Sequence, residues 1–128
     1  MTDSSRKVLV VDDEPELVET ITELLDFEGI PVTGAGSVDQ AIGALKDASE
    51  KGAPYTFIIS DIQMPEKNGK ELLKWVLGNE SLIPKPYYTF MTGFSDDSEQ
   101  DLIGLGAQKV LKKPFSVDSL LDLIASVH

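Results

Sequence analysis

Acidic side chains follow two short apolar segments of this sequence. Asp12 and Asp13 come directly after Val8–Val11, and Asp61 comes directly after residues 57–60. If the two segments are neighbouring parallel strands, their carboxyl ends share one edge of a sheet, which brings three carboxylates together. Two carboxylates about 5 Å apart repel by roughly 3 kcal/mol at an effective dielectric constant near 20, so a cation would relieve the cluster. Oxygen-only ligands favour a hard ion such as Mg²⁺.

Two more polar residues stand where later apolar segments end. Thr92 follows Tyr87–Met91, and Lys113 comes shortly after Val110–Leu111. If a phosphate entered beside the cation, a carboxylate could act as nucleophile and form an aspartyl phosphate, while the metal neutralised charge on the transferring group. Thr92 could donate its hydroxyl to one phosphoryl oxygen and Lys113 its ammonium to another. These residue types predict phosphoryl transfer by positioning and electrostatics.

The elements that would position these residues follow from the apolar spacing. Short apolar segments predict five buried strands at Val8–Val11, Val32–Ala35, Phe57–Ile59, Tyr87–Met91 and Val110–Leu111. Between and after them the apolar period becomes helical, over residues 17–25, 38–48 and 117–124, with a further helix after Asn68. Residues 98–105 form the weakest predicted helix, because Gly104 and a thin apolar face disfavour it.

Residues at the predicted helix starts agree with this spacing. Pro15 suits a first helical position, Ser37 with Gln40 has the spacing of a capping box, and Asn68 with Glu71 has its related acidic form. Strands alternating with helices predict the α/β class, with a doubly wound five-stranded parallel sheet covered on both faces. Among the alternative strand orders we choose 2-1-3-4-5, which places the ligand crevice beyond strands 1 and 3.

Length and composition limit what the chain can do. We expect residues 1–128 to form a single domain, with residues 1–6 as a disordered or frayed N-terminus. The net charge of -11 disfavours nucleic acid and anionic membranes as partners. The absence of cysteine excludes disulfides and thiolate metal sites. With no apolar stretch near the roughly 20 residues of a membrane span and no export signal, we expect a cytoplasmic protein.

Four segments together resemble the motifs of one family, the receiver domains of two-component response regulators. They occur in the family's order and near its usual spacing, as Val10–Pro15, Asp61–Pro65, Met91–Gly93 and Lys113–Phe115. The similarity extends over essentially the whole chain, and each motif is weak alone but specific in this combination. The resemblance implies the flavodoxin-like (βα)5 fold, and it supports the strand order 2-1-3-4-5 as much as the derivation above does.

The resemblance also implies roles for individual residues. Asp61 would be the phosphoacceptor, Thr92 the switch hydroxyl and Lys113 the invariant lysine. The Mg²⁺ ligands would be Asp13, Asp61 and the backbone carbonyl of Gln63, with Asp12 of the acidic pair acting through a water. The bond from Lys113 to the following proline is often cis in such domains.

A bacterial signalling role follows from the same resemblance. The phosphoryl donor would be a sensor histidine kinase or a histidine phosphotransfer protein, and the phosphorylated domain would act on a downstream protein or form a homodimer. The domain would be a switch and not a turnover enzyme. Two features depart from the family pattern: Val110 stands where an aromatic residue is usual, and the interval from Thr92 to Lys113 is one residue short. Gln63 and Phe94 would border the pocket and could gate attacking water.

Other interpretations of the same residues stay open at this point. Asp12 and Asp13 could simply favour a helix start, and Asp61 could be a turn residue. Among functions, the runner-up is a binding module with the receiver fold that signals without phosphorylation. A metal-dependent phosphatase would ordinarily need an acid where Gln63 stands. A flavin mononucleotide carrier would need a phosphate loop that the acidic pair would repel.

Overall fold

The computed structural model describes residues 6–93, 98–113 and 116–126 of the chain. The strands are β1 (Val8–Val11), β2 (Val32–Ala35), β3 (Phe57–Asp61), β4 (Tyr87–Thr92) and β5 (Lys109–Lys112). The helices are α1 (Pro15–Phe27), α2 (Val38–Glu50), α3 (Gly69–Gly78), α4 (Glu99–Gly104) and α5 (Val117–Ser126). Strands and helices therefore alternate along the chain, as the apolar spacing predicts.

All strand pairs of the sheet are parallel, and the order is β2-β1-β3-β4-β5. Both the predicted fold class and the predicted order are confirmed. The register places Val11 beside Ala35 of β2 on one side and beside Ser60 of β3 on the other. The residues that follow these positions, Asp12 and Asp61, consequently lie at the same level at the carboxyl-terminal edge of the sheet.

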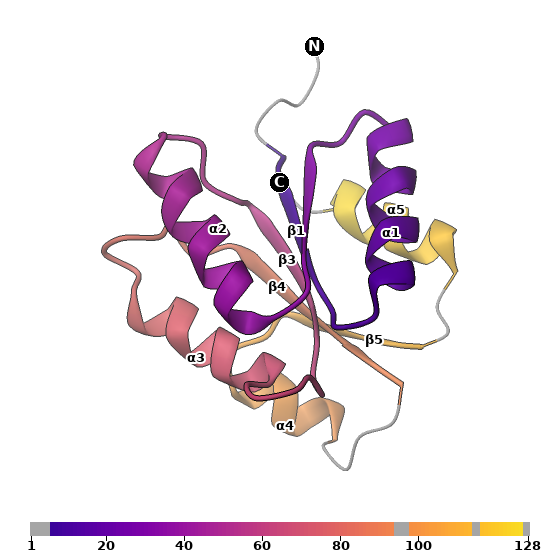
Figure 1. The fold of residues 1–128 in the computed structure, drawn as a ribbon. Coiled ribbons are helices and arrows are strands. Elements are labelled where there is room, and N and C mark those ends of the chain that lie inside the picture. Colours follow the sequence, from indigo (N-terminus) through magenta and orange to yellow (C-terminus); the bar gives the residue numbers. More distant parts are fainter. Residues whose placement is uncertain (1–5, 94–97, 114–115, 127–128) are drawn as a thin grey trace.

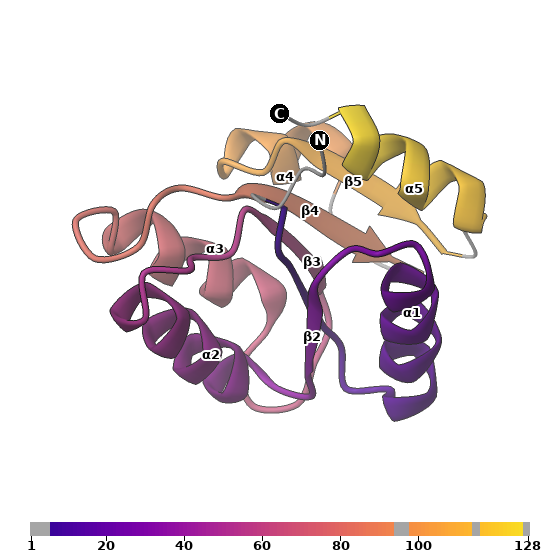
Figure 2. The same cartoon turned by 90° about the horizontal axis from the view of Figure 1, so that it is seen from above.

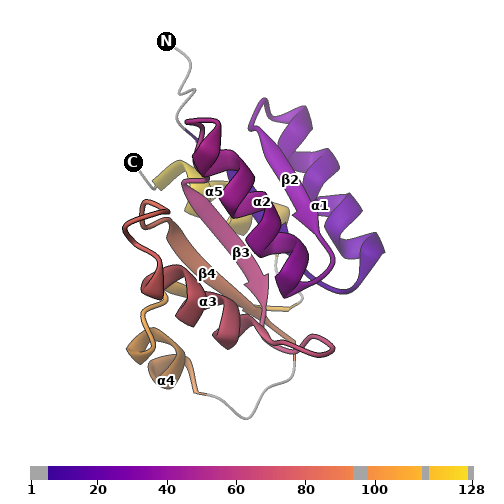
Figure 3. The same cartoon turned by 60° about the vertical axis from the view of Figure 1, so that its left-hand side comes forward.

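Helices cover both faces of the sheet. Helices α1 and α5 lie on one face, and α2, α3 and α4 lie on the other (Figures 1 and 2). From the side shown in Figure 3, α2 and α3 are seen in front of the sheet, with α4 beside α3. Strand residues alternate between the two cores: Leu9 and Ile58 pack toward α2 and α3, whereas Val10 and Ile59 pack toward α1 and α5.

The positions of the predicted helix starts are confirmed, although the Gln40 side chain bonds to Gly36 and not to the N-cap residue Ser37, as it would in a capping box. Pro15 is the first residue of α1. Ser37 accepts a hydrogen bond from the backbone N–H of Gln40 at 3.1 Å, and the Gln40 side chain in turn accepts one from the N–H of Gly36 at 2.7 Å. Asn68 accepts from the N–H of Glu71 at 2.9 Å at the start of α3. These caps satisfy backbone donors that have no partner inside the helix.

The structure corrects some predicted boundaries. Strands β3 and β4 include Asp61 and Thr92 as their last residues, whereas we placed both residues after the strands. Backbone pairing therefore continues past the apolar positions. Arg6, which we included in the frayed N-terminus, donates a hydrogen bond to the carbonyl of Ala125 at 3.1 Å. Residues 1–5 of that prediction, Phe94 and the Lys113–Pro114 bond lie outside the described residues.

The least secure predicted helix is the shortest one observed. Helix α4 has six residues, and Ser98 caps it by accepting a hydrogen bond from the N–H of Asp101 at 3.1 Å.

Among the described residues, no helix combines the length and the apolar composition needed to pass through a bilayer.

Candidate metal and phosphoryl site

Three carboxylates meet at the carboxyl-terminal edge of the sheet. Asp12 follows β1, and its N–H bonds to the carbonyl of Ala35, so it continues the pairing with β2. Asp61 is the last residue of β3. Asp12, Asp13 and Asp61 each offer an oxygen that lies within 4.8 Å of the others. The predicted convergence of these three residues from separate strands is therefore present in the structure.

Asp12 is the buried anchor of this cluster. Its side chain is fully buried, and both carboxylate oxygens accept hydrogen bonds. Oδ1 accepts from the N–H of Glu14 at 2.9 Å, and Oδ2 accepts from Nζ of Lys113 at 2.9 Å. A buried carboxylate requires such partners to remain charged. Asp12 is thus fixed in orientation and in turn holds the lysine.

Lys113 brings the only ammonium group among the described residues that line this pocket. Its Nζ lies 3.5 Å from Oδ2 of Asp61 and 3.8 Å from Oε1 of Glu14, in addition to its bond to Asp12. Its backbone N–H donates to the carbonyl of Thr92 at 2.8 Å, which ties the end of β5 to the end of β4. Burial acts to lower the pKa of Lys113, but the hydrogen bond to Asp12 and the surrounding carboxylates outweigh it and raise that pKa. The side chain therefore remains charged at neutral pH.

Asp61 has two carboxylate oxygens in different surroundings. Oδ1 accepts a hydrogen bond from the N–H of Ile62 at 2.8 Å, whereas Oδ2 faces Lys113. Burial is the main cause that raises the pKa of Asp61, and the charge of Asp12 raises it further; Lys113 and the Ile62 amide oppose them. The raised pKa marks a carboxylate whose charge is incompletely compensated, which is the condition that a cation would relieve.

An open pocket of about 330 Å³ gives access to Asp61. The described residues that line it are Asp13, Glu14, Asp61, Ile62, Gln63, Thr92, Gly93 and Lys113. The predicted site residues Asp13, Asp61, Gln63, Thr92 and Lys113 all belong to this lining. Asp12 instead lines the neighbouring groove between α1 and β2, and contacts the site through Lys113.

Sequence reasoning missed the residues that hold the connection from β3 to α3. The N–H of Gly69 donates to the carbonyl of Ile62 at 2.8 Å, and the hydroxyl of Tyr88 donates to the carbonyl of Gly69 at 2.9 Å. Ser60 donates its hydroxyl to the carbonyl of Asp61 at 2.9 Å. A Cβ atom at Gly69 would collide with the Asp61 carbonyl oxygen. Because this connection contains Gln63, these contacts position the pocket.

One of these residues carried a signal in the sequence. Tyr88 stands in a buried strand, and a buried tyrosine hydroxyl needs a hydrogen-bond partner. Burial raises the pKa of Tyr88, so its hydroxyl stays protonated and acts as a donor. The identity of the acceptor, Gly69, depends on how the chain returns after β3, and no local pattern gives it.

The donor set fits Mg²⁺. All three acidic side chains offer hard oxygen ligands, and Asp13 is exposed, so it can turn. One oxygen of each side chain lies within 4.8 Å of the others, so the three could share one cation. A Mg²⁺ ion held there by carboxylates and water would neutralise part of their negative charge.

This fold and this site define a receiver domain. The chain belongs to the response regulator receiver domain family, whose model matches residues 8–125. The homologous transcriptional regulatory protein CpxR of Klebsiella pneumoniae is 33% identical over 122 residues, which are 94% of this chain and 48% of that protein. The C4-dicarboxylate transport transcriptional regulatory protein DctD of Pseudomonas aeruginosa is 33% identical over 124 residues, which are 95% of this chain and 25% of that protein. The chain thus spans half or less of the length of these relatives.

Solved structures of receiver domains match nearly the whole chain. The chemotaxis protein CheY4 of Vibrio cholerae has a TM-score of 0.81 and 27% identity, covering 96% of this chain and 98% of its own. A response regulator receiver domain from Clostridium thermocellum has a TM-score of 0.79 and 26% identity, covering 94% of this chain and 92% of its own. The family membership and the fold are therefore established, while the roles of individual residues remain predictions.

Proposed function

We propose that Asp61 accepts a phosphoryl group from a phosphohistidine of a sensor histidine kinase or histidine phosphotransfer protein, in a Mg²⁺-dependent reaction. One observation carries the proposal: the Asp61 carboxylate belongs to the three-carboxylate cluster and also lies 3.5 Å from Lys113. The first feature suits a cation, and the second suits a phosphoryl oxygen. The phosphorylated domain would then change a protein-interaction face.

The nucleophile in this proposal is Oδ2 of Asp61. The amide of Ile62 holds Oδ1 by a hydrogen bond, so we take Oδ2, which lies 3.5 Å from Nζ of Lys113, as the attacking oxygen. A bond forms from Oδ2 to phosphorus while the bond from phosphorus to the donor's imidazole nitrogen breaks, and the electron pair leaves with the imidazole. Asp61 must be ionised to attack, and the open pocket that it lines would give a phosphoryl donor access to its carboxylate.

The acidic residues would hold the ion that this reaction uses. Asp13, Asp61 and the carbonyl of Gln63 are the proposed direct ligands, and Asp12 would act through a water. When bound, Mg²⁺ neutralises negative charge on the phosphoryl oxygens. Asp12 would also keep Lys113 directed at Asp61 through its 2.9 Å hydrogen bond.

Lys113 and Thr92 would detect the phosphorylated state. The Lys113 ammonium would pass from the carboxylates to a phosphoryl oxygen, and the Thr92 hydroxyl would donate to another. Thr92 ends β4 beside Lys112 of β5, and its carbonyl accepts from the N–H of Lys113. A shift of Thr92 would therefore move the ends of both strands and displace α4, which follows β4 in the chain.

Val110 limits how this shift can spread. It lies opposite Phe90 in the β4–β5 pairing and is 7% exposed within the core. A valine in this place has no ring that could turn between a buried and an exposed position. The proposed signal therefore depends on the backbone link between Thr92 and Lys113, and it would reach a downstream protein or a homodimer partner through α4, β5 and α5.

Acetyl phosphate provides the test, because it can donate a phosphoryl group without a kinase. With Mg²⁺, intact-mass measurement should detect one added phosphoryl group, and Asp61→Asn should abolish the addition. Asp122→Asn, which removes an exposed carboxylate of α5, should leave it intact. An unmodified wild-type protein would favour the alternative, a cytoplasmic binding module of the same fold. We expect a switch in the cytoplasm that undergoes modification without turning over a substrate.

A further inference from the structure

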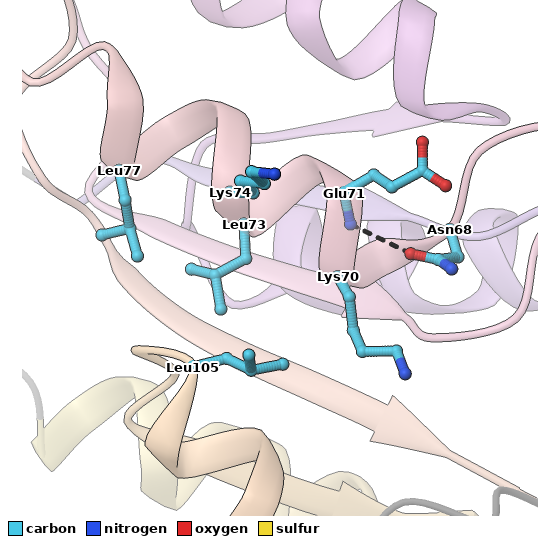
Figure 4. A pocket seen from close by; sticks show the side chains of 7 residues that line it. All are labelled: Asn68, Lys70, Glu71, Leu73, Lys74, Leu77 and Leu105. Atoms are coloured by element: carbon cyan, nitrogen blue, oxygen red, sulfur yellow. Dashed lines mark hydrogen bonds between the residues drawn. The ribbon is translucent and has the colours of Figure 1, made fainter.

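A groove between α3 and the connection from α4 to β5 is not used by the proposed phosphoryl chemistry. It encloses about 340 Å³. Leu73, Leu77 and Leu105 form its apolar part, and Lys70, Glu71 and Lys74 are the charged residues beside them (Figure 4). None of these residues lines the pocket around Asp61. The groove is therefore a separate surface feature.

The short helix α4 leaves this groove open. Leu105 directly follows the last residue of α4 and is 49% exposed, and in Figure 4 it reaches toward Leu73 of α3. Gly106 has a φ of 120° and packs so closely on Leu77 that a Cβ atom would lie 2.7 Å from the Leu77 Cδ1 atom. This tight turn fixes the chain against α3 and keeps Leu105 at the surface. Removing apolar surface from water is favourable, so a partner that covered the exposed half of Leu105 would gain affinity.

The charges beside the groove differ in sign from those of the chain as a whole. The chain has a net charge of -11, yet the described residues that line the groove include two lysines and one glutamate. Lys70 projects from α3 on the same side as Leu73 and Leu77 (Figure 4). The acidic surface elsewhere repels an acidic partner, and the two lysines attract one at this place. Charge complementarity therefore selects an acidic occupant with apolar anchors.

We infer that this groove docks a short, acidic, amphipathic helix from a partner protein. Apolar side chains at helical spacing would pack against Leu77 and Leu105, above the buried Leu73, and Asp or Glu residues would face Lys70 and Lys74. The groove volume is at the low end of the 300–1,000 Å³ typical of ligand pockets, which suits few anchoring side chains. Docking requires no phosphoryl group, because the groove is formed by residues outside the Asp61 pocket.

Selection from a library of random peptides, about 15 residues long, tests this inference on the complete unphosphorylated chain. The enriched peptides should be acidic, with apolar residues three and four positions apart, and fluorescence anisotropy should give their affinities. Leu105→Lys should weaken binding about tenfold or more, and Lys74→Glu about fivefold.

Two control variants match these changes outside the groove. Leu82→Lys replaces a leucine that is 45% exposed, close to the exposure of Leu105. Lys85→Glu makes the same charge reversal as Lys74→Glu at another exposed lysine. Both controls should bind the selected peptides within about twofold of wild type. A thermal melt of each variant checks folding, and Lys74→Glu decides the question if Leu105→Lys is unfolded.

Several results would overturn the inference. These are a selection without enrichment, enriched peptides that are neutral or basic, and peptides that bind Leu105→Lys or Lys74→Glu as tightly as they bind wild type. Sedimentation velocity tests a second copy of the chain as the occupant. If the wild-type protein forms a dimer and Leu105→Lys dissociates it, the groove is a self-association surface. That result would overturn the proposal of an acidic partner helix. Because no step uses acetyl phosphate, these outcomes are independent of the proposed phosphorylation.

Discussion

The ammonium group of Lys113 joins Asp12 to Asp61 across the edge of the sheet. Its Nζ lies 2.9 Å from Oδ2 of the fully buried Asp12 and 3.5 Å from Oδ2 of Asp61. The residue proposed to bind a phosphoryl oxygen is thus also the cation that compensates two buried carboxylates. The proposed phosphorylation would therefore be linked to stability through one side chain.

Lys113→Met tests this double role. Removing the ammonium leaves Asp12 buried without its cation, and breaking such a pair costs about 3–5 kcal/mol when it is fully buried. Because the Lys113 side chain is 18% exposed, we expect a loss of about 2 kcal/mol in urea denaturation at pH 7. Mg²⁺ should restore part of this loss. Lys112→Met, at the exposed neighbouring position, should change stability by less than about 0.5 kcal/mol. Equal effects of the two variants would refute the structural role.

Mg²⁺ affinity should depend on Asp13. Its carboxylate belongs to the cluster with Asp12 and Asp61, so Asp13→Ala removes a proposed ligand. Calorimetric titration should detect one weak site in the wild-type protein and about tenfold weaker binding in the variant. Glu16→Ala removes an acidic side chain from the first turn of α1, outside the cluster, and should have a much smaller effect. Unchanged affinity in Asp13→Ala would exclude Asp13 as a ligand.

The raised pKa of Asp61 predicts a defined pH dependence. Burial and the charge of Asp12 raise this pKa above its ordinary value of 3.8. Between 3.8 and the raised pKa the folded state binds more protons than the unfolded state, so stability falls as the pH rises through this window. At neutral pH without metal, Asp61→Asn should therefore be more stable than wild type, and its advantage should shrink as the pH falls toward 3.8. Urea denaturation across this pH range measures the difference.

The control for this comparison is Asp122→Asn, whose carboxylate is exposed on α5. It should show no comparable pH-dependent gain. Phosphorylation of wild type should also decline as the pH falls through the raised pKa of Asp61, because the protonated carboxyl cannot attack phosphorus. An Asp61→Asn variant that is less stable than wild type at pH 7 would contradict the assigned pKa direction.

Gly69 should tolerate no side chain. A Cβ atom there would collide with the backbone carbonyl oxygen of Asp61 and would lie 2.8 Å from Oγ of Ser60. Gly69→Ala must move the start of α3 away from the site, so we expect it to destabilise the fold by about 2 kcal/mol and to slow phosphorylation. At Gly43, in α2, a Cβ atom would have no other part of the protein within 4 Å beyond the backbone of its own helix. Gly43→Ala should therefore stabilise the fold by about 0.5–1 kcal/mol. Similar stabilities of the two variants would show that Gly69 has free space.

The sequence predicts the convergence of the site because the relevant residues end parallel strands. Asp12, Asp61, Thr92 and Lys113 each stand at or just after the end of a predicted strand. In a parallel sheet these ends share one edge, so the topology places all four residues there. Their roles come from the family resemblance, which composition and spacing alone do not supply. The predicted ends of β3 and β4 are wrong, because both strands continue through the polar residues Asp61 and Thr92.

Other features depend on contacts between side chains that are distant in sequence. Lys113 is 101 positions from Asp12, and which of the nearby carboxylates it contacts depends on the packing of both side chains. Tyr88 reaches the carbonyl of Gly69 only because the β3–α3 connection returns toward β4. The exposure of Leu105 likewise depends on where α4 ends. Apolar periodicity contains none of this information.

Thr89 offers a test of the buried core, independent of the site. It lies in β4 between Tyr88 and Phe90, it is fully buried, and its Oγ1 has no hydrogen-bond partner among the described residues. Strand alternation directs its side chain to the same face as Met91, which packs in the core beneath α1 and α5. A buried hydroxyl without a partner costs about 1–3 kcal/mol, and valine has nearly the same shape.

Thr89→Val should therefore raise the free energy of unfolding by about 1 kcal/mol in urea denaturation. Thr20→Val is the matched control, because the Thr20 hydroxyl is exposed and donates to the carbonyl of Glu16 at 2.8 Å. This control should lie within about 0.5 kcal/mol of wild type. If Thr89→Val were destabilising, its hydroxyl would have to be hydrogen-bonded in solution. A buried water with further polar partners would be the physical explanation for that result.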